Sequence, residues 1–101
     1  MLSFSRGEIT AIRTFCQLYI NDGLPSQKYF DRISTRVQKN LISSALHKLS
    51  DVLTNQELTR DEATVLCMAF TYALNNYEIG GDQADLIAMY NRLADHAGFP
   101  A

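Results

Sequence analysis

The sequence predicts an all-α fold: a compact bundle of four to five helices that forms a single domain over residues 1–101. Glycine and proline together number seven, too few for a fold built from many tight turns. Apolar side chains recur at helical spacing along most of the chain. Two helix-start signatures also stand 54 positions apart, Ser5 with Glu8 and Thr59 with Glu62.

The first helix is expected over residues 5–21. A serine N-cap accepts a hydrogen bond from the amide three positions on, and the Glu8 carboxylate can accept one from the Ser5 amide. Gly23 can adopt the left-handed cap that ends a helix, and Pro25 cannot continue one. The buried face of this helix would carry the apolar side chains Ile9, Ile12, Cys16 and Tyr19.

Two apolar stripes follow, and they do not share a face of one straight helix. The second stripe points roughly 100° further round than the first. We therefore expect a break or bend near Gln38 to Asn40, with one helix over 26–37 and another over 41–54. The first stripe comprises Phe30, Ile33, Val37 and Leu41, and the second comprises Ile42, Ala45, Leu49 and Val52.

The next helix is expected over residues 59–76, and it is apolar on almost every side. Such a helix belongs in the middle of a bundle or at an oligomer interface. Gly80 and Gly81 end this region, Asp82 is the expected N-cap of a last helix, and Gly98 is its expected C-cap.

The two helix-start signatures suggest an internal duplication. The chain would then consist of two pseudo-repeated helical hairpins, over 5–37 and 59–98, joined by the helix over 41–54. An ordinary bundle without duplication is the alternative.

Charge is divided unevenly along the chain. Residues 1–50 hold seven basic and three acidic side chains, whereas residues 51–101 hold two basic and eight acidic ones. Four basic side chains fall within an arc of about 80° on the helix expected over 26–37, and Tyr29 lies between this arc and the apolar face. The basic face could be solvated, pair with the chain's own acidic half, or bind a partner. Its residues are Lys28, Tyr29, Arg32, Arg36 and Lys39.

Aromatic residues on the apolar helix over 59–76 could line a homodimer seam, since tyrosine suits interfaces. Tyrosine equally suits the rim of a small core. The seam would comprise Phe70, Tyr72 and Tyr77.

Catalytic and metal-binding patterns are absent from the sequence. Cys16 and Cys67 do not have the spacing of a metal site, so no metal and no cofactor are expected. Both cysteines sit among apolar neighbours, which favours buried thiols, a reducing compartment and a cytoplasmic location over a disulfide. His47 and His96 are expected on exposed faces without a nucleophile beside them. The chain is therefore expected not to be an enzyme, and no membrane span is predicted.

These features favour a small non-enzymatic protein-binding module that acts by stoichiometric contact with another protein. Adaptors, inhibitors and immunity-type accessory proteins of bacteria and phages are of this kind. The alternative is a nucleic-acid-binding regulator that uses the basic face. Nucleic acid is the less favoured partner because the formal net charge is −2.

Overall fold

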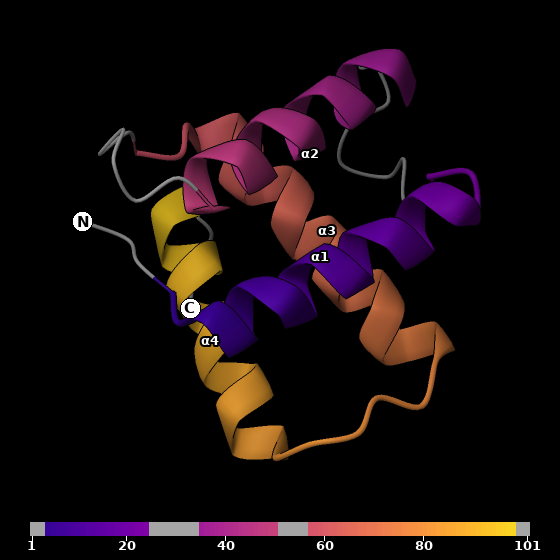
Figure 1. The fold of residues 1–101 in the computed structure, drawn as a ribbon, viewed down its shortest axis with the longest axis vertical. Helices are drawn as coiled ribbons and strands as arrows, with labels where there is room; N and C mark the ends of the chain where they lie inside the picture. Colours follow the sequence, from indigo (N-terminus) through magenta and orange to yellow (C-terminus); the bar gives the residue numbers. More distant parts are fainter. Residues whose placement is uncertain (1–3, 25–34, 51–56, 99–101) are drawn as a thin grey trace.

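The computed structural model describes residues 4–24, 35–50 and 57–98. These residues form four helices and no strand, which confirms the all-α prediction (Figure 1). The radius of gyration is 12.6 Å, close to the roughly 13 Å of a folded domain of this length. The helices are α1 (Arg6–Asn21), α2 (Thr35–Ser50), α3 (Arg60–Asn76) and α4 (Gln83–Ala97).

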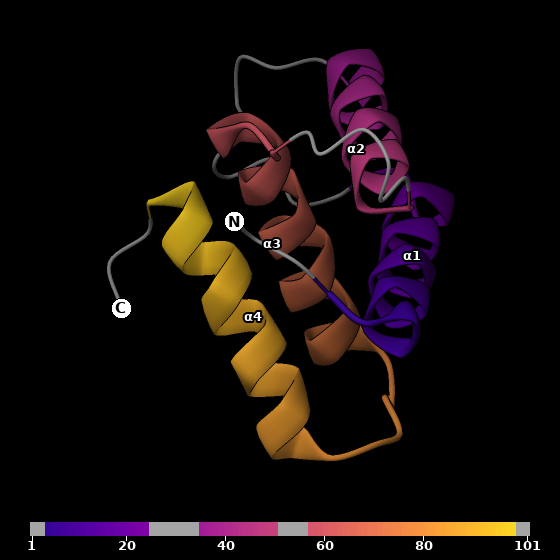
Figure 2. The same ribbon diagram turned by 60° about the vertical axis from the view of Figure 1, so that its left-hand side comes forward.

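Helix α3 lies at the centre of the bundle and packs against the other three helices. Figure 2 shows it between α4 on one side and the pair α1 and α2 on the other. Its surroundings explain its composition, because nearly every side of the helix faces protein. The prediction of a helix in the middle of the bundle is confirmed by the burial of Glu62, Ala63, Val65, Leu66, Cys67, Met68, Ala69, Phe70 and Ala73.

Aromatic rings connect three helices through the core. The Phe70 ring of α3 meets the Phe15 ring of α1 edge-on, with ring centroids 4.8 Å apart. On its other side, Phe70 lies 5.9 Å from the Tyr90 ring of α4. Offset and edge-on pairs of this kind add to the burial energy of each ring.

Both predicted capping boxes are present. At the start of α1, the Glu8 amide donates to Ser5 Oγ over 3.2 Å, and the Ser5 amide donates to Glu8 Oε1 over 2.9 Å. At the start of α3, the corresponding distances between Thr59 and Glu62 are 3.1 Å and 2.7 Å. The duplication itself stays a prediction, since two good helix starts resemble each other without common descent.

The predicted ends of α1 and α4 are also confirmed. Gly23 has a φ of 86°, and the Leu24 amide donates to the Tyr19 carbonyl over 2.9 Å, which closes the last turn of α1. Asp82 caps the start of α4 by accepting a hydrogen bond from the Ala84 amide over 2.8 Å. Gly98 ends this helix with a φ of 79°.

The predicted break between Gln38 and Asn40 is wrong, because α2 runs through this point without interruption. The helix continues by burying a polar residue within its apolar face. Gln38 is fully buried, and its Oε1 accepts a hydrogen bond from the buried Tyr19 hydroxyl over 2.9 Å. Val37, which the stripe analysis placed inward, is instead 44% exposed. Most of the separate helix expected over 26–37 lies outside the described residues.

Candidate functional site

The basic face is described in part, through Arg36 and Lys39. Both side chains are exposed on α2, whose own sequence contains no acidic residue. Lys28, Tyr29 and Arg32 lie outside the described residues.

Most other basic side chains of the described residues are engaged inside the bundle. Four of them bridge segments far apart in the sequence: Arg13 donates to Ser50 Oγ, Lys48 to Glu62 Oε1, Arg60 to the Ala97 carbonyl, and Arg92 to Glu8 Oε2. Two of these contacts, Lys48–Glu62 and Arg92–Glu8, are ion pairs between the basic and acidic halves of the chain.

The internal pairing of the two halves therefore occurs, but not through the described part of the basic face. Within residues 4–24, 35–50 and 57–98, Arg36 and Lys39 form no ion pair. They place two exposed positive charges on the outer side of α2, and no acidic side chain of the described ranges pairs with them.

The dimer seam stays a prediction, but its first residue, Phe70, faces inward. Phe70 is 1% exposed and packs within its own chain, so it cannot meet a second copy in this fold. Tyr72 is half-buried and Tyr77 is 38% exposed.

Tyr72 and Tyr77 converge on one carboxylate at the end of α1. Both hydroxyls donate to Asp22 Oδ2, over 2.6 Å from Tyr72 and 2.5 Å from Tyr77. An acid at a helix C-terminus opposes the helix dipole, and these two donors offset that effect. The three side chains fasten the end of α1 to the end of α3, so a structural role accounts for both tyrosines.

The two hydroxyls change the acidity of the groups they join. The hydrogen bond from Tyr72, followed by that from Tyr77, holds the pKa of Asp22 below its ordinary value of 3.8. The hydrogen bond to Asp22 raises the pKa of Tyr72 to about 12 and also raises that of Tyr77. A carboxylate with a lowered folded-state pKa stabilises the fold above its unfolded pKa, and this contribution is lost as the pH falls.

Replacing both tyrosines by phenylalanine, in Tyr72→Phe/Tyr77→Phe, removes the donors while keeping the rings. We expect the pKa of Asp22 to rise toward 3.8, measured by the carboxyl carbon shift in an NMR titration. Tyr90→Phe is the matched control and leaves this titration unchanged. An unaltered Asp22 titration in the double variant would contradict the proposed hydrogen bonds.

A buried ion pair joins α2 to the start of α3. Glu62 is 2% exposed, and its Oε1 lies 2.7 Å from Lys48 Nζ. Burial alone would raise the pKa of Glu62. Hydrogen bonds from Lys48, Ser44 and Thr59 together outweigh that effect and lower it.

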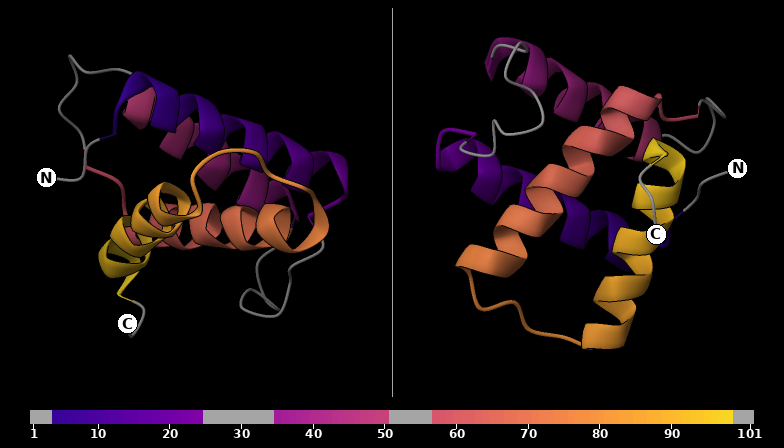
Figure 3. Two further views of the ribbon diagram at one scale, coloured as in Figure 1. Left: turned by 90° about the horizontal axis from the view of Figure 1, so that it is seen from below. Right: turned by 180° about the vertical axis from the view of Figure 1, so that it is seen from behind.

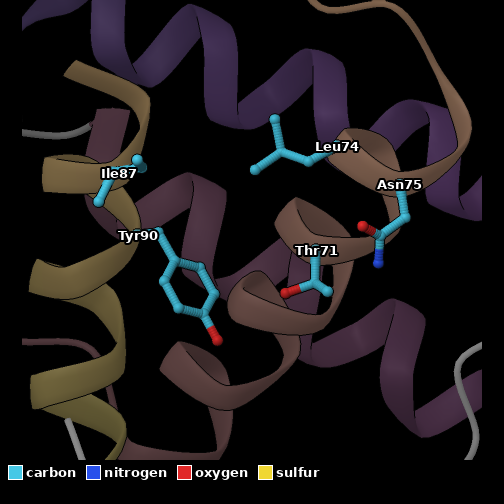
Figure 4. Close-up of a pocket in the computed structure, with 5 residues that line it drawn as sticks. All are labelled: Thr71, Leu74, Asn75, Ile87 and Tyr90. Carbon is cyan, nitrogen blue, oxygen red and sulfur yellow. The ribbon is translucent and has the colours of Figure 1, made fainter. Parts of the chain in front are cut away.

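A shallow groove opens between α3 and α4, with a volume of about 280 Å³. Figure 4 shows Leu74 pointing from α3 toward α4, and the Tyr90 ring extending from α4 into the space between the two helices. Leu74 is 36% exposed and Ile87 is 54% exposed, so the groove offers adjacent apolar surface to solvent. The groove is lined by Thr71, Leu74, Asn75, Ile87 and Tyr90, none of which carries a charge at neutral pH.

The nucleophilic and metal-ligating side chains lie apart. Cys16 and Cys67 are buried thiols that form no disulfide, and burial raises the pKa of each to about 12. His47 is exposed as predicted, whereas His96 is half-buried and its Nε2 lies 2.7 Å from the Leu58 carbonyl. In the described part of the chain, no three His, Cys, Asp or Glu side chains are grouped to hold a metal ion.

Sequence reasoning missed the groove and the Asp22 contacts. Ile87 was a usable signal for the groove, because it lies off the helical spacing shared by Leu86, Met89 and Leu93 and is therefore expected on the surface of the last helix. None of the helices in the described ranges combines the length and the apolar character needed to cross a bilayer. Comparisons with protein families, curated proteins and solved structures find no match to this chain.

Proposed function

We propose that this chain is a small protein-binding module that acts by stoichiometric contact, with the exposed face of α2 as a binding surface. The observation that carries the proposal is the exposed charge of Arg36 and Lys39, which form no ion pair with the part of the chain that the structure describes. Four other basic side chains form contacts within the bundle, whereas Arg36 and Lys39 are exposed and available to a partner.

The partner that suits this face is a protein with an acidic surface. Exposed charges of one sign accelerate association with the opposite sign and exclude partners of like charge. Adaptor, inhibitor or immunity-type accessory proteins of bacteria and phages work by contacts of this kind. A non-enzymatic, cytoplasmic role agrees with this proposal. The proposed basic face also includes Lys28, Tyr29 and Arg32 in the sequence before α2.

Charge reversal tests the proposal directly. The unaltered protein should capture a partner from a lysate of its native host. We expect Arg36→Glu/Lys39→Glu to lower the affinity for that partner by at least about tenfold. Capture by the unaltered protein should weaken as salt is added. Arg6→Glu is the matched control, because Arg6 is equally basic and exposed but lies on α1.

A partner that binds the reversed variant as tightly as the unaltered protein would refute a role for this face. The nucleic-acid alternative gains support only if the purified protein binds duplex DNA and the affinity falls steeply with salt. We expect no such binding, since the chain is acidic overall.

A further inference from the structure

Helices α3 and α4 form a V that is closed at one end and open at the other (Figures 1 and 3). At the closed end, Arg60 Nε donates to the Ala97 carbonyl over 2.9 Å, and His96 Nε2 lies 2.7 Å from the Leu58 carbonyl. At the open end, the two helices are joined by residues 77–82. The groove lies toward this open end, since its lining comes from the last turns of α3 and the first turns of α4.

The open end of the V leaves apolar surface that no element of the described chain covers. Leu74 and Ile87 lie on opposite walls, with the half-buried Tyr90 ring between the helices (Figure 4). The groove is large enough for apolar side chains to enter, and each of its walls extends over about one helical turn. Such dimensions match the apolar face of a helix, whose anchors stand three or four residues apart.

The segment of the chain that lines the groove carries charge of a single sign. Residues 71–90, which include all five lining residues, contain Glu78, Asp82 and Asp85 and neither lysine nor arginine. Two of the acids, Glu78 and Asp82, are exposed in the connection that joins α3 to α4 at the open end of the V. A ligand at this end therefore meets negative charge beside an apolar surface.

We propose that this groove binds a basic amphipathic helix of another protein. Two apolar side chains of that helix would enter between Leu74 and Ile87, while its lysines or arginines would lie over Glu78 and Asp82. A two-fold contact between copies of this chain is disfavoured, since it would bring the same acidic residues together without a basic residue in 71–90 to offset them. The site is separate from the face of α2.

Three synthetic helical peptides of about four turns provide the probe. One has leucine on one face and lysine on the other, the second replaces lysine by glutamate, and the third replaces leucine by serine. In fluorescence anisotropy we expect only the leucine–lysine peptide to bind, more weakly as salt rises.

Variants of the protein locate the site. Ile87→Ser should weaken peptide binding by about tenfold, whereas Val37→Ser, at another exposed apolar position, should not. Glu78→Gln/Asp82→Asn should lower the affinity and flatten its dependence on salt, and asparagine still caps α4. Glu57→Gln is the control for charge, because Glu57 is exposed before the start of α3.

Equal binding of the leucine–glutamate peptide, or binding unaffected by Ile87→Ser, would overturn the proposal. Self-association that Ile87→Ser abolishes would overturn it as well, since the occupant would then be a second copy. Arg36→Glu/Lys39→Glu should leave peptide binding within about twofold, which keeps this test distinct from that of the α2 face.

Discussion

Phe70→Ala is expected to destabilise the fold by about 3–5 kcal/mol. The Phe70 ring is 1% exposed and contacts aromatic rings of both α1 and α4. Its removal therefore leaves a cavity between three helices, which could fill it only by moving toward one another. The loss is a large part of the roughly 5–15 kcal/mol that stabilises a small domain. Chemical denaturation followed by circular dichroism measures it as a lower unfolding midpoint.

Ile87→Ala is the control for this experiment, because Ile87 is the most exposed of the large apolar side chains described. It should change the free energy of unfolding by less than about 1 kcal/mol. If Phe70→Ala kept full stability and instead shifted a dimer to a monomer, the ring would belong to a seam after all. Light scattering on the same samples separates these two results.

Lys48→Met is expected to cost about 3 kcal/mol at neutral pH. In the unaltered protein, Lys48 Nζ lies 2.7 Å from Glu62 Oε1. The substitution leaves the Glu62 carboxylate buried without this ammonium partner. Lys48→Met/Glu62→Gln should recover more than half of the loss, because glutamine is uncharged and its oxygen can still accept from the Thr59 amide. Lys39→Met, on the exposed face of the same helix, should change stability by less than about 0.5 kcal/mol.

The pH dependence of this effect has a defined sign. In the unaltered protein the pKa of Glu62 lies below its ordinary value of 4.5, so its contribution is present above that pH and is lost as the pH falls. In Lys48→Met, the loss of the ammonium partner should let burial raise the pKa of Glu62. The difference in unfolding free energy between the two proteins should therefore shrink as the pH is lowered from neutrality toward 4.5. A difference that is constant over this range would contradict the buried-charge explanation.

The helix boundaries were predictable because their signals are local. Ser5 and Thr59 each act within three residues, and the backbone requirements of Gly23 and Gly98 need no knowledge of distant contacts. The central position of α3 was also predictable, because a helix without a polar face must be covered on all sides.

The predicted break in α2 was wrong because it was based on residue spacing within one segment, whereas the continuity of α2 depends on a contact with a distant residue. The two stripes were drawn from apolar side chains alone, so neither included Gln38, which shares the buried face of α2 with Ile42 and Ala45. The hydroxyl that satisfies it comes from Tyr19, 19 positions away. A buried polar side chain can be accommodated when it has a hydrogen-bond partner, and that partner is visible only in the folded structure.

The candidate surfaces were predictable only in part for the same reason. Composition indicates that Phe70 is covered but does not say whether its own chain or a second copy covers it. The partners of Asp22 stand 50 and 55 positions away, and the exposure of Ile87 depends on the angle at which α3 and α4 cross. The charge of Arg36 and Lys39 was evident, but their lack of ion pairs within the described residues required the positions of the competing acids.

The Tyr19–Gln38 hydrogen bond sets the rotational and axial register of α2 on α1. Apolar contacts are non-directional, so they tolerate a change of register. A hydroxyl and an amide do not, since a shift of one turn would break the hydrogen bond between them, and a buried polar group left unsatisfied costs about 1–3 kcal/mol. One glutamine therefore distinguishes the native alignment from its nearest competitors, and it keeps Arg36 and Lys39 on the outer side of the bundle.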